Sequence, residues 1–227
     1  MLAAVLFDMD GTLVDSEKLW DVSLAQLADH LGGELTPQLR ADVVGGSLHS
    51  TIGKLHRALD VPAHVDPATS AAYLLDATGA LFRTDIQWRP GAKELLTELD
   101  AAGVPMALVT STVRALTELV LDAIGRHWFG ATVCGDEVAH VKPAADPYLR
   151  AAELLGVDPV HCAAIEDSDT GTRSALAAGC AVLTVPHDAP VPDGPGRRFA
   201  GSLEEIDHAA LRRLVAEHHA AGRGTDR

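Results

Sequence analysis

The sequence predicts an α/β protein with a doubly wound parallel sheet and an inserted helical segment. Two observations predict this class. From residue 90 onward, short apolar runs alternate with amphipathic segments of helix length, which is the pattern of repeated strand–helix–strand units. Residues 16–87 interrupt this alternation and show helical periodicity alone.

The first element is the apolar run of residues 3–7, which is typical of a strand buried in a parallel sheet. In residues 16–87, which follow, apolar side chains recur at helical spacing. The periodic positions are Leu19, Val22, Leu24, Leu27, Ile52, Leu55 and Leu59. We therefore predict a Rossmann-like core of residues 1–15 and 88–227, with a helical cap of residues 16–87.

The second half of the chain continues the strand–helix alternation. A helix is predicted from Pro90 to about Ala102, where Gly103 ends it. The elements after it are a strand at 104–109, a helix at 113–124, a strand at 132–134, a helix at 147–155, a strand at 162–165, a helix at 169–178 and a strand at 181–185. Right-handed crossovers then allow the first, second and fourth strands to lie side by side, with their carboxyl ends together.

The C-terminal part of the chain carries weaker signals. Residues 186–196 contain four prolines and two glycines, which predict a surface loop. Residues 203–216 have the pattern of a last helix, and residues 218–227 are expected to form a frayed tail.

Composition limits the partners and the compartment. A formal charge of −14 opposes nucleic-acid binding, and no apolar stretch is long enough to cross a bilayer. We expect no cleaved leader, because its removal would take Asp8 with it. Cys134, Cys162 and Cys180 are odd in number and lie in or beside predicted strands, as reduced core thiols of a cytoplasmic protein do. The sequence does not indicate an oligomeric state.

Acidic residues at the ends of two predicted strands indicate a cation site. Asp8 and Asp10 place two carboxylates in one tight turn after the first strand, and Glu166 and Asp167 end the fourth. Two unit charges about 4 Å apart repel by about 4 kcal/mol at an effective dielectric near 20. A divalent cation would compensate this charge, and Mg²⁺ is the usual one where a phosphate completes the coordination shell.

Thr110, Ser111 and Lys142 supply the complementary groups. Thr110 and Ser111 follow the second predicted strand, and Lys142, one of only four lysines, lies between the third and the fourth. Because parallel sheets bind ligands at their carboxyl edge, these residues predict a phosphate-handling site there.

These motifs resemble those of the haloacid dehalogenase (HAD) superfamily, in its small-cap phosphatase and β-phosphoglucomutase-like branch. The matching segments are residues 8–15 for the first motif, Thr110 for the second, Lys142 and Pro143 for the third, and 166–168 with Gly171 and 178–179 for the fourth. The resemblance extends to about Val185, with the motifs in the right order.

The resemblance implies a Mg²⁺-dependent phosphomonoester hydrolase that acts on a small, sugar-phosphate-like metabolite. Asp8 would attack phosphorus and form an aspartyl-phosphate, and Asp10 would act as general acid and base. The remaining roles are Mg²⁺ binding by Asp8, Asp10 (through its backbone carbonyl), Glu166 and Asp167, and phosphate binding by Thr110, Ser111 and Lys142. Specificity is expected from the cap, with Gly45, Gly46, Ser47 and Trp20 as candidates.

Other members of the superfamily and a signalling domain agree less well with these residues. A true dehalogenase needs no second carboxylate, so Asp10 argues against it. A hexose-phosphate mutase shares all four motifs, but the mutases resemble one another in a histidine where this chain has Trp20. A phospho-receiver signalling domain would have about half this length, with its phosphorylated aspartate on a middle strand. We expect the phosphatase.

Overall fold

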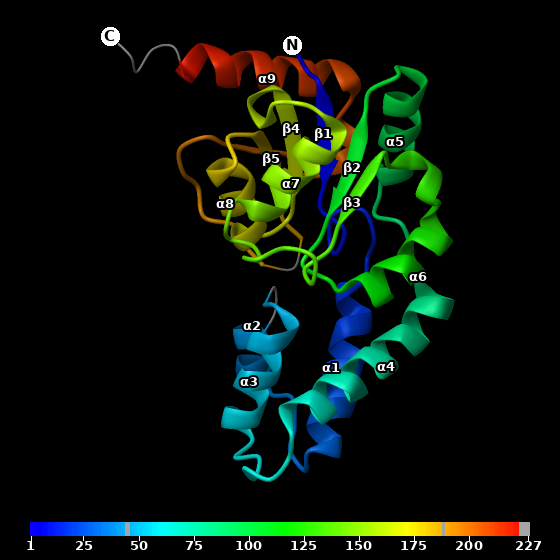
Figure 1. The fold of residues 1–227 in the computed structure, drawn as a ribbon, viewed down its shortest axis with the longest axis vertical. Helices are drawn as coiled ribbons and strands as arrows, with labels where there is room; N and C mark the ends of the chain where they lie inside the picture. The colour runs from blue at the N-terminus through cyan, green and yellow to red at the C-terminus, as the bar shows by residue number, and fades with distance from the viewer. Residues whose placement is uncertain (44–45, 188, 223–227) are drawn as a thin grey trace.

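The computed structural model describes residues 1–43, 46–187 and 189–222. A sheet flanked by helices forms one part, and helices α1–α4 form a second part beyond one end of the strands (Figure 1). The helix α9 lies at the opposite end of the strands. No helix among these residues is long and apolar enough to cross a membrane.

The sheet of the described residues is parallel throughout, with the strand order β3-β2-β1-β4-β5-β6. The strands are β1 (Ala4–Phe7), β2 (Met106–Val109), β3 (Ala131–Val133), β4 (Cys162–Glu166), β5 (Ala181–Thr184) and β6 (Arg197–Phe199). Val5 of β1 pairs with Met106 of β2 and with Ala163 of β4. The predicted doubly wound α/β sheet is therefore confirmed, as is the adjacency of its first, second and fourth strands.

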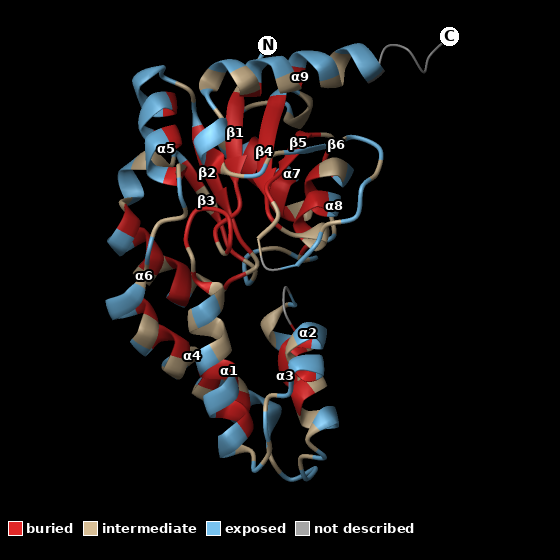
Figure 2. Ribbon diagram, turned by 180° about the vertical axis from the view of Figure 1, so that it is seen from behind, coloured by how far each residue is buried: buried red, intermediate tan, exposed pale blue. Residues whose placement is uncertain are grey.

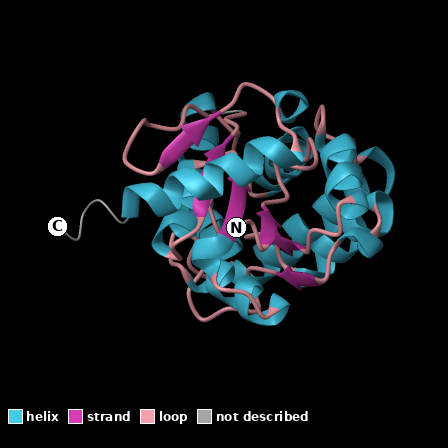
Figure 3. Ribbon diagram, turned by 90° about the horizontal axis from the view of Figure 1, so that it is seen from above, coloured by secondary structure: helices cyan, strands magenta, loops and turns pink. Residues whose placement is uncertain are grey.

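Every residue of β1 is buried, because helices cover both faces of the sheet (Figures 2 and 3). Side chains alternate between the faces. Val5 and Phe7 join the cluster that includes α5 and α6, whereas Ala4 and Leu6 join the cluster that includes α7 and α8. The helices of this part are α5 (Ala92–Ala101), α6 (Arg114–Ile124), α7 (Asp146–Leu155), α8 (Asp169–Ala177) and α9 (His208–Gly222).

The inserted segment folds into α1 (Glu17–His30), α2 (Pro37–Val43), α3 (Leu48–Ala58) and α4 (Pro67–Asp85). It has its own buried cluster, to which Leu27, Leu55 and Leu74 belong. At its base, α4 approaches α6 closely, since Gly79 lies against the side chain of Leu116. The helices predicted here are present, and the division of the chain into core and cap stays a prediction.

Several local predictions were wrong. The strand β6 was not predicted, and the last helix begins at His208 after a short 3-10 turn at Leu203–Glu205. This helix continues to Gly222, so the part of the expected frayed tail up to that residue is helical. Its last turns are fixed because the rings of His218 and His219 hydrogen-bond the backbone carbonyls of Gly179 and Val160.

Two further side chains can be placed. Val22, one of the periodic apolar positions, is 45% exposed, because it lies on the outer face of α1. Cys134, Cys162 and Cys180 are free and buried, as predicted.

Candidate active site

A cavity of about 140 Å³ lies between the carboxyl edge of the sheet and helices α1–α4. Asp8 and Asp10 line it from the end of β1, and Asp167 lines it from the end of β4. Lys142 reaches it from the loop after β3. The sheet topology therefore brings together side chains that are far apart in the sequence.

Lys142 is the centre of a buried ionic cluster. Its Nζ donates hydrogen bonds to Asp8 Oδ1 and to Glu166 Oε1, each at 2.6 Å, and to the carbonyl oxygen of Val109 at 2.9 Å. All three ammonium protons therefore have acceptors, which a buried lysine requires. The contact holds Lys142 against the carboxylate of Asp8.

Glu166 is fixed from two further sides. The hydroxyl of Tyr148 donates to Glu166 Oε1 at 2.5 Å, and the Tyr148 ring centroid lies 5.2 Å from Lys142 Nζ. Gly171 packs directly on this carboxylate, since a Cβ there would lie closer than 3.0 Å to it. The glycine of the fourth motif thus makes room for Glu166. Tyr148 was missed because in the sequence it looks like an ordinary core position of a helix.

Burial, and to a lesser degree neighbouring charges, shift the pKa values of the carboxylates in this cluster. Burial raises the pKa of Asp8 from its ordinary value of 3.8 to about 7; the charge of Lys142 opposes this rise, and the charges of Glu166 and Asp10 add to it. Burial, with the charge of Asp8, raises the pKa of Asp167 well above its usual range. Burial disfavours the charged form of Lys142, yet its carboxylate neighbours raise its pKa overall. Full ionisation of Asp8 and Asp167 is therefore disfavoured beside the single charge of Lys142.

The donor set at this edge fits a hard divalent cation. Asp8, Glu166 and Asp167 each offer a carboxylate oxygen, and these atoms lie within 4.8 Å of one another. Lys142 supplies one positive charge for the three carboxylates, and oxygen ligands are those that Mg²⁺ prefers. Gly11, with φ of +78°, lets Asp167 approach, because a Cβ at Gly11 would overlap Asp167 Oδ2.

The side chain of Asp10 accepts hydrogen bonds from four donors. Ser16 Oγ donates to Asp10 Oδ1 at 2.5 Å, and Trp20 Nε1 donates to the same oxygen at 3.2 Å. Asp10 Oδ2 accepts from Thr112 Oγ1 at 2.8 Å and from Thr110 Oγ1 at 3.2 Å. Asp10 therefore joins the loop after β2 to the start of α1. The contacts of Ser16 and Thr112 were not foreseen.

The predicted phosphate-binding residues all line the cavity. Thr110 Oγ1 also accepts a hydrogen bond from the backbone N–H of Thr112 at 3.0 Å. The Thr110 hydroxyl therefore stabilises the turn and also donates to Asp10. Ser111 is the neighbouring residue of the same turn. The turn closes on Gly135, where a Cβ would overlap the backbone carbonyl of Ser111.

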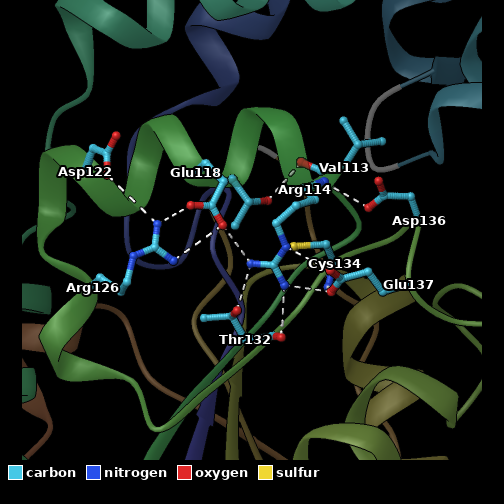
Figure 4. A network of polar contacts seen from close by, with 10 residues as sticks. Val113, Arg114, Glu118, Asp122, Arg126, Thr132, Cys134, Asp136 and Glu137 are labelled. Atoms are coloured by element: carbon cyan, nitrogen blue, oxygen red, sulfur yellow. Dashed lines mark hydrogen bonds and ion pairs between the residues drawn. The ribbon is translucent and has the colours of Figure 1, made fainter.

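A network behind this turn fixes the start of α6 (Figure 4). The guanidinium of Arg114 binds both carboxylate oxygens of Glu137, at 2.8 and 2.7 Å, and donates to Thr132 Oγ1 at 2.8 Å. The backbone N–H of Arg114 donates to Asp136 Oδ1 at 2.8 Å. The network therefore connects α6 to β3 and to the turn after it.

The predicted cap candidates have different positions. Trp20 and Gly46 line the cavity, whereas Ser47 is the N-cap residue of α3, where its side chain accepts the N–H of Ser50 at 3.3 Å. Gly45 lies outside the described residues. Asp21 and Arg40, which line the cavity from α1 and α2 and form an ion pair, were not predicted from the sequence.

The family follows from comparison with known proteins. Residues 2–179 match the family described as haloacid dehalogenase-like hydrolases, and the chain belongs to this family. The predictions of the family and of an enzyme are confirmed.

Individual relatives agree with this assignment. The chain is 33% identical over 192 residues to fructose-1-phosphate phosphatase YqaB of Escherichia coli. This match covers 81% of this chain and 96% of the relative. It is 34% identical over 189 residues to hexitol phosphatase A of the same organism, with 82% and 84% covered. Among solved structures, CbbY from Rhodobacter sphaeroides in complex with phosphate is 28% identical, with a TM-score of 0.83 and 93% and 99% covered.

Proposed function

We propose that this chain is a Mg²⁺-dependent phosphomonoester hydrolase that acts on a small, sugar-like phosphorylated metabolite through an aspartyl-phosphate. One observation carries the proposal: a buried Asp8 is held against Lys142 in a cavity that Asp10 also lines. The names of the relatives, a fructose-1-phosphate phosphatase and a hexitol phosphatase, support this substrate class. The small cavity agrees with it, since pockets for drug-sized ligands are larger, at about 300–1,000 Å³.

The reaction would proceed in two displacements at phosphorus. A carboxylate oxygen of Asp8 attacks, the bond between phosphorus and the ester oxygen breaks, and Asp10 gives its proton to the leaving alcohol. Water then attacks the phosphorus of the aspartyl-phosphate while Asp10 takes a proton from it. Inorganic phosphate leaves, the carboxylate of Asp8 is restored, and Asp10 is again protonated. General acid–base assistance of this kind contributes about 10²–10⁴ in rate.

The cation and the phosphoryl group would be held by separate residues. Asp8, Glu166 and Asp167, with the backbone carbonyl of Asp10, would bind Mg²⁺, which when bound supplies positive charge to a site crowded with carboxylates and phosphate. The groups that would orient the phosphoryl oxygens are Thr110, Ser111 and Lys142.

Residues 16–87 would act as a cap on the core of residues 1–15 and 88–227. Leu24, Leu48 and Leu74 of this segment line the cavity, so the surface over the reacting groups is largely apolar. Such a cover excludes water from the first displacement. Trp20 and Gly46, which line the same wall, would contact the leaving group, and the roles of Gly45 and Ser47 in specificity remain part of the proposal.

The experiment is phosphate release from a panel of small phosphomonoesters, with Mg²⁺ and with chelator. Wild type is compared with Asp8→Asn and with Asp100→Asn, which removes a carboxylate from an exposed position on α5. We expect turnover that requires Mg²⁺, is lost in Asp8→Asn and is kept in Asp100→Asn. Isomerisation of a hexose phosphate without hydrolysis would favour the mutase instead, and a stable phosphoprotein without turnover would favour a signalling domain.

A further inference from the structure

The part of the cavity lining that α1 and α2 provide includes a charged pair. Arg40 Nε of α2 donates to Asp21 Oδ1 of α1 at 2.6 Å, and the two side chains are 33% and 31% exposed. Both residues line the cavity. Within the described part of the chain, this is the one hydrogen bond that the carboxylate of Asp21 receives. Its second oxygen accepts no hydrogen bond from the described residues, and its side chain is partly exposed at the cavity.

The charges around the cavity leave little attraction for a second anion. Among the described residues that line it, the cations are Arg40 and Lys142, against five carboxylates. Those carboxylates are Asp8, Asp10, Glu17, Asp21 and Asp167. Lys142 is bound by Asp8 and Glu166, and Arg40 is bound by Asp21. A negative group on the cap side of the substrate would therefore lie close to Asp21 without a surplus of positive charge to offset the repulsion.

The same cavity also has apolar lining residues from α1–α4. Leu24, Val43, Leu48 and Leu74 line the cavity, as does Trp20. Apolar side chains with a few fixed polar groups are the usual lining of a small-molecule site. This combination matches a neutral polyol, whose C–H groups would pack on the leucines while its hydroxyls reach the pair.

We propose that the Asp21–Arg40 pair selects the leaving group, by binding hydroxyls of a sugar or polyol and by rejecting a substrate that carries a second phosphate. Asp21 accepts hydrogen bonds from the hydroxyls, and Arg40 holds Asp21 in place and balances its charge. Because the two charges of the pair balance one another, the pair offers a second phosphate no net attraction to offset the loss of its hydration, and this supplies the selectivity against bisphosphates. The inference rests on the proposed function and assigns the discrimination to this pair.

Three substrates separate the contributions. Fructose 1-phosphate and fructose 1,6-bisphosphate differ in the second phosphate, and p-nitrophenyl phosphate has neither hydroxyls nor a second phosphate. Steady-state kcat/KM is measured for wild type, Asp21→Asn, Arg40→Gln and the matched control Asp29→Asn. The control removes a carboxylate from an exposed position of the same helix α1. Thermal melting of each variant confirms that it is folded.

The two variants of the pair should shift selectivity in opposite directions. In Asp21→Asn, the preference for the monophosphate over the bisphosphate should fall about tenfold, because the carboxylate that offsets the charge of Arg40 is gone. In Arg40→Gln, the preference should rise, because the charge of Asp21 is no longer balanced. Turnover of p-nitrophenyl phosphate should change little in either variant, and Asp29→Asn should match wild type on all three substrates.

Other outcomes would overturn the inference. If both variants lower all three activities alike, the pair only joins α1 to α2. If Asp29→Asn shifts the preference as Asp21→Asn does, the selectivity comes from overall charge. An inert wild type would instead overturn the proposed function, so the two failures are distinguishable.

Discussion

Gly171→Ala is the substitution whose cost follows most directly from the structure. A Cβ at Gly171 would lie closer than 3.0 Å to all three terminal atoms of the Glu166 carboxylate. Glu166 is completely buried and accepts hydrogen bonds from Lys142 at 2.6 Å and Tyr148 at 2.5 Å, so its carboxylate cannot turn away without losing these contacts. The added methyl group therefore breaks contacts on the far side of Glu166.

The magnitude follows from the contacts at risk. Hydrogen bonds to charged groups contribute about 1.5–3 kcal/mol each, and two are threatened here. Alanine is favoured over glycine in a helix by about 1 kcal/mol, which offsets part of the loss. We expect the free energy of unfolding of Gly171→Ala to fall by about 2–5 kcal/mol. Phosphatase activity should fall with it, because Lys142 also holds Asp8.

The assay is urea unfolding followed by circular dichroism, with the same substitution at Gly53 as the control. Gly53 lies within α3, and the nearest atom to its added Cβ would be Arg57 Nη1, at 3.5 Å. Gly53→Ala should therefore gain about 0.5–1 kcal/mol. If Gly171→Ala were as stable as wild type, or gained stability as Gly53→Ala should, the tight packing of Gly171 on Glu166 would be refuted.

Three further predictions concern Asp10, Glu137 and Asp8. Trp20→Phe removes the indole N–H that donates to Asp10 and keeps an aromatic ring in place; kcat should fall about tenfold, measured in steady state. Glu137→Gln weakens the paired hydrogen bonds from Arg114, and its cost in urea unfolding should be about 1 kcal/mol, since both side chains are partly exposed. That cost should shrink in high salt, because salt screens exposed charges. In chelator, the metal-free protein should lose stability as the pH rises from about 4 to about 7, because the pKa of buried Asp8 is raised to about 7. Urea unfolding at several pH values measures this loss.

The sign of the pH effect follows from proton binding. The folded protein keeps a proton on Asp8 up to about pH 7, whereas the unfolded chain releases it near 3.8. Between these values the unfolded state binds fewer protons, so stability falls as the pH rises. Asp167 acts in the same direction. Asp8→Asn should flatten the dependence of stability on pH, and a wild-type stability that rises across this range would contradict the assignment.

For Trp20→Phe, an unchanged kcat would show that the N–H of Trp20 does not position Asp10.

The core of the fold was predictable because each strand around the site is an apolar run that ends in a polar motif. β1 and β4 are of this kind, and both are buried along their whole length. β6 has no such signal: Arg198 and Phe199 in it are exposed at the edge of the sheet. The end of α9 was missed because the carbonyls that its histidines bind belong to distant loops.

The motifs also indicated which side chains meet at the sheet edge, but not how they are held. Asp8 and Glu166 follow or end predicted strands and Lys142 lies in the loop after a third, and parallel topology brings such segments together at the carboxyl ends of the strands. The contact of Tyr148 with Glu166 depends on the direction of a side chain from a helix, which periodicity does not reveal. The pairing of Asp21 with Arg40 likewise depends on how α1 and α2 lie against one another.

The central claim is that Asp8 carries the phosphoryl group during turnover. We would mix enzyme, Mg²⁺ and fructose 1-phosphate, quench with acid within one turnover, and locate phosphorylation by peptide mass spectrometry. The account predicts a phosphoryl group on Asp8 that is absent in Asp8→Asn and absent in chelator. Hydrolysis without any phosphoenzyme, or with the phosphoryl group on another residue, would contradict it.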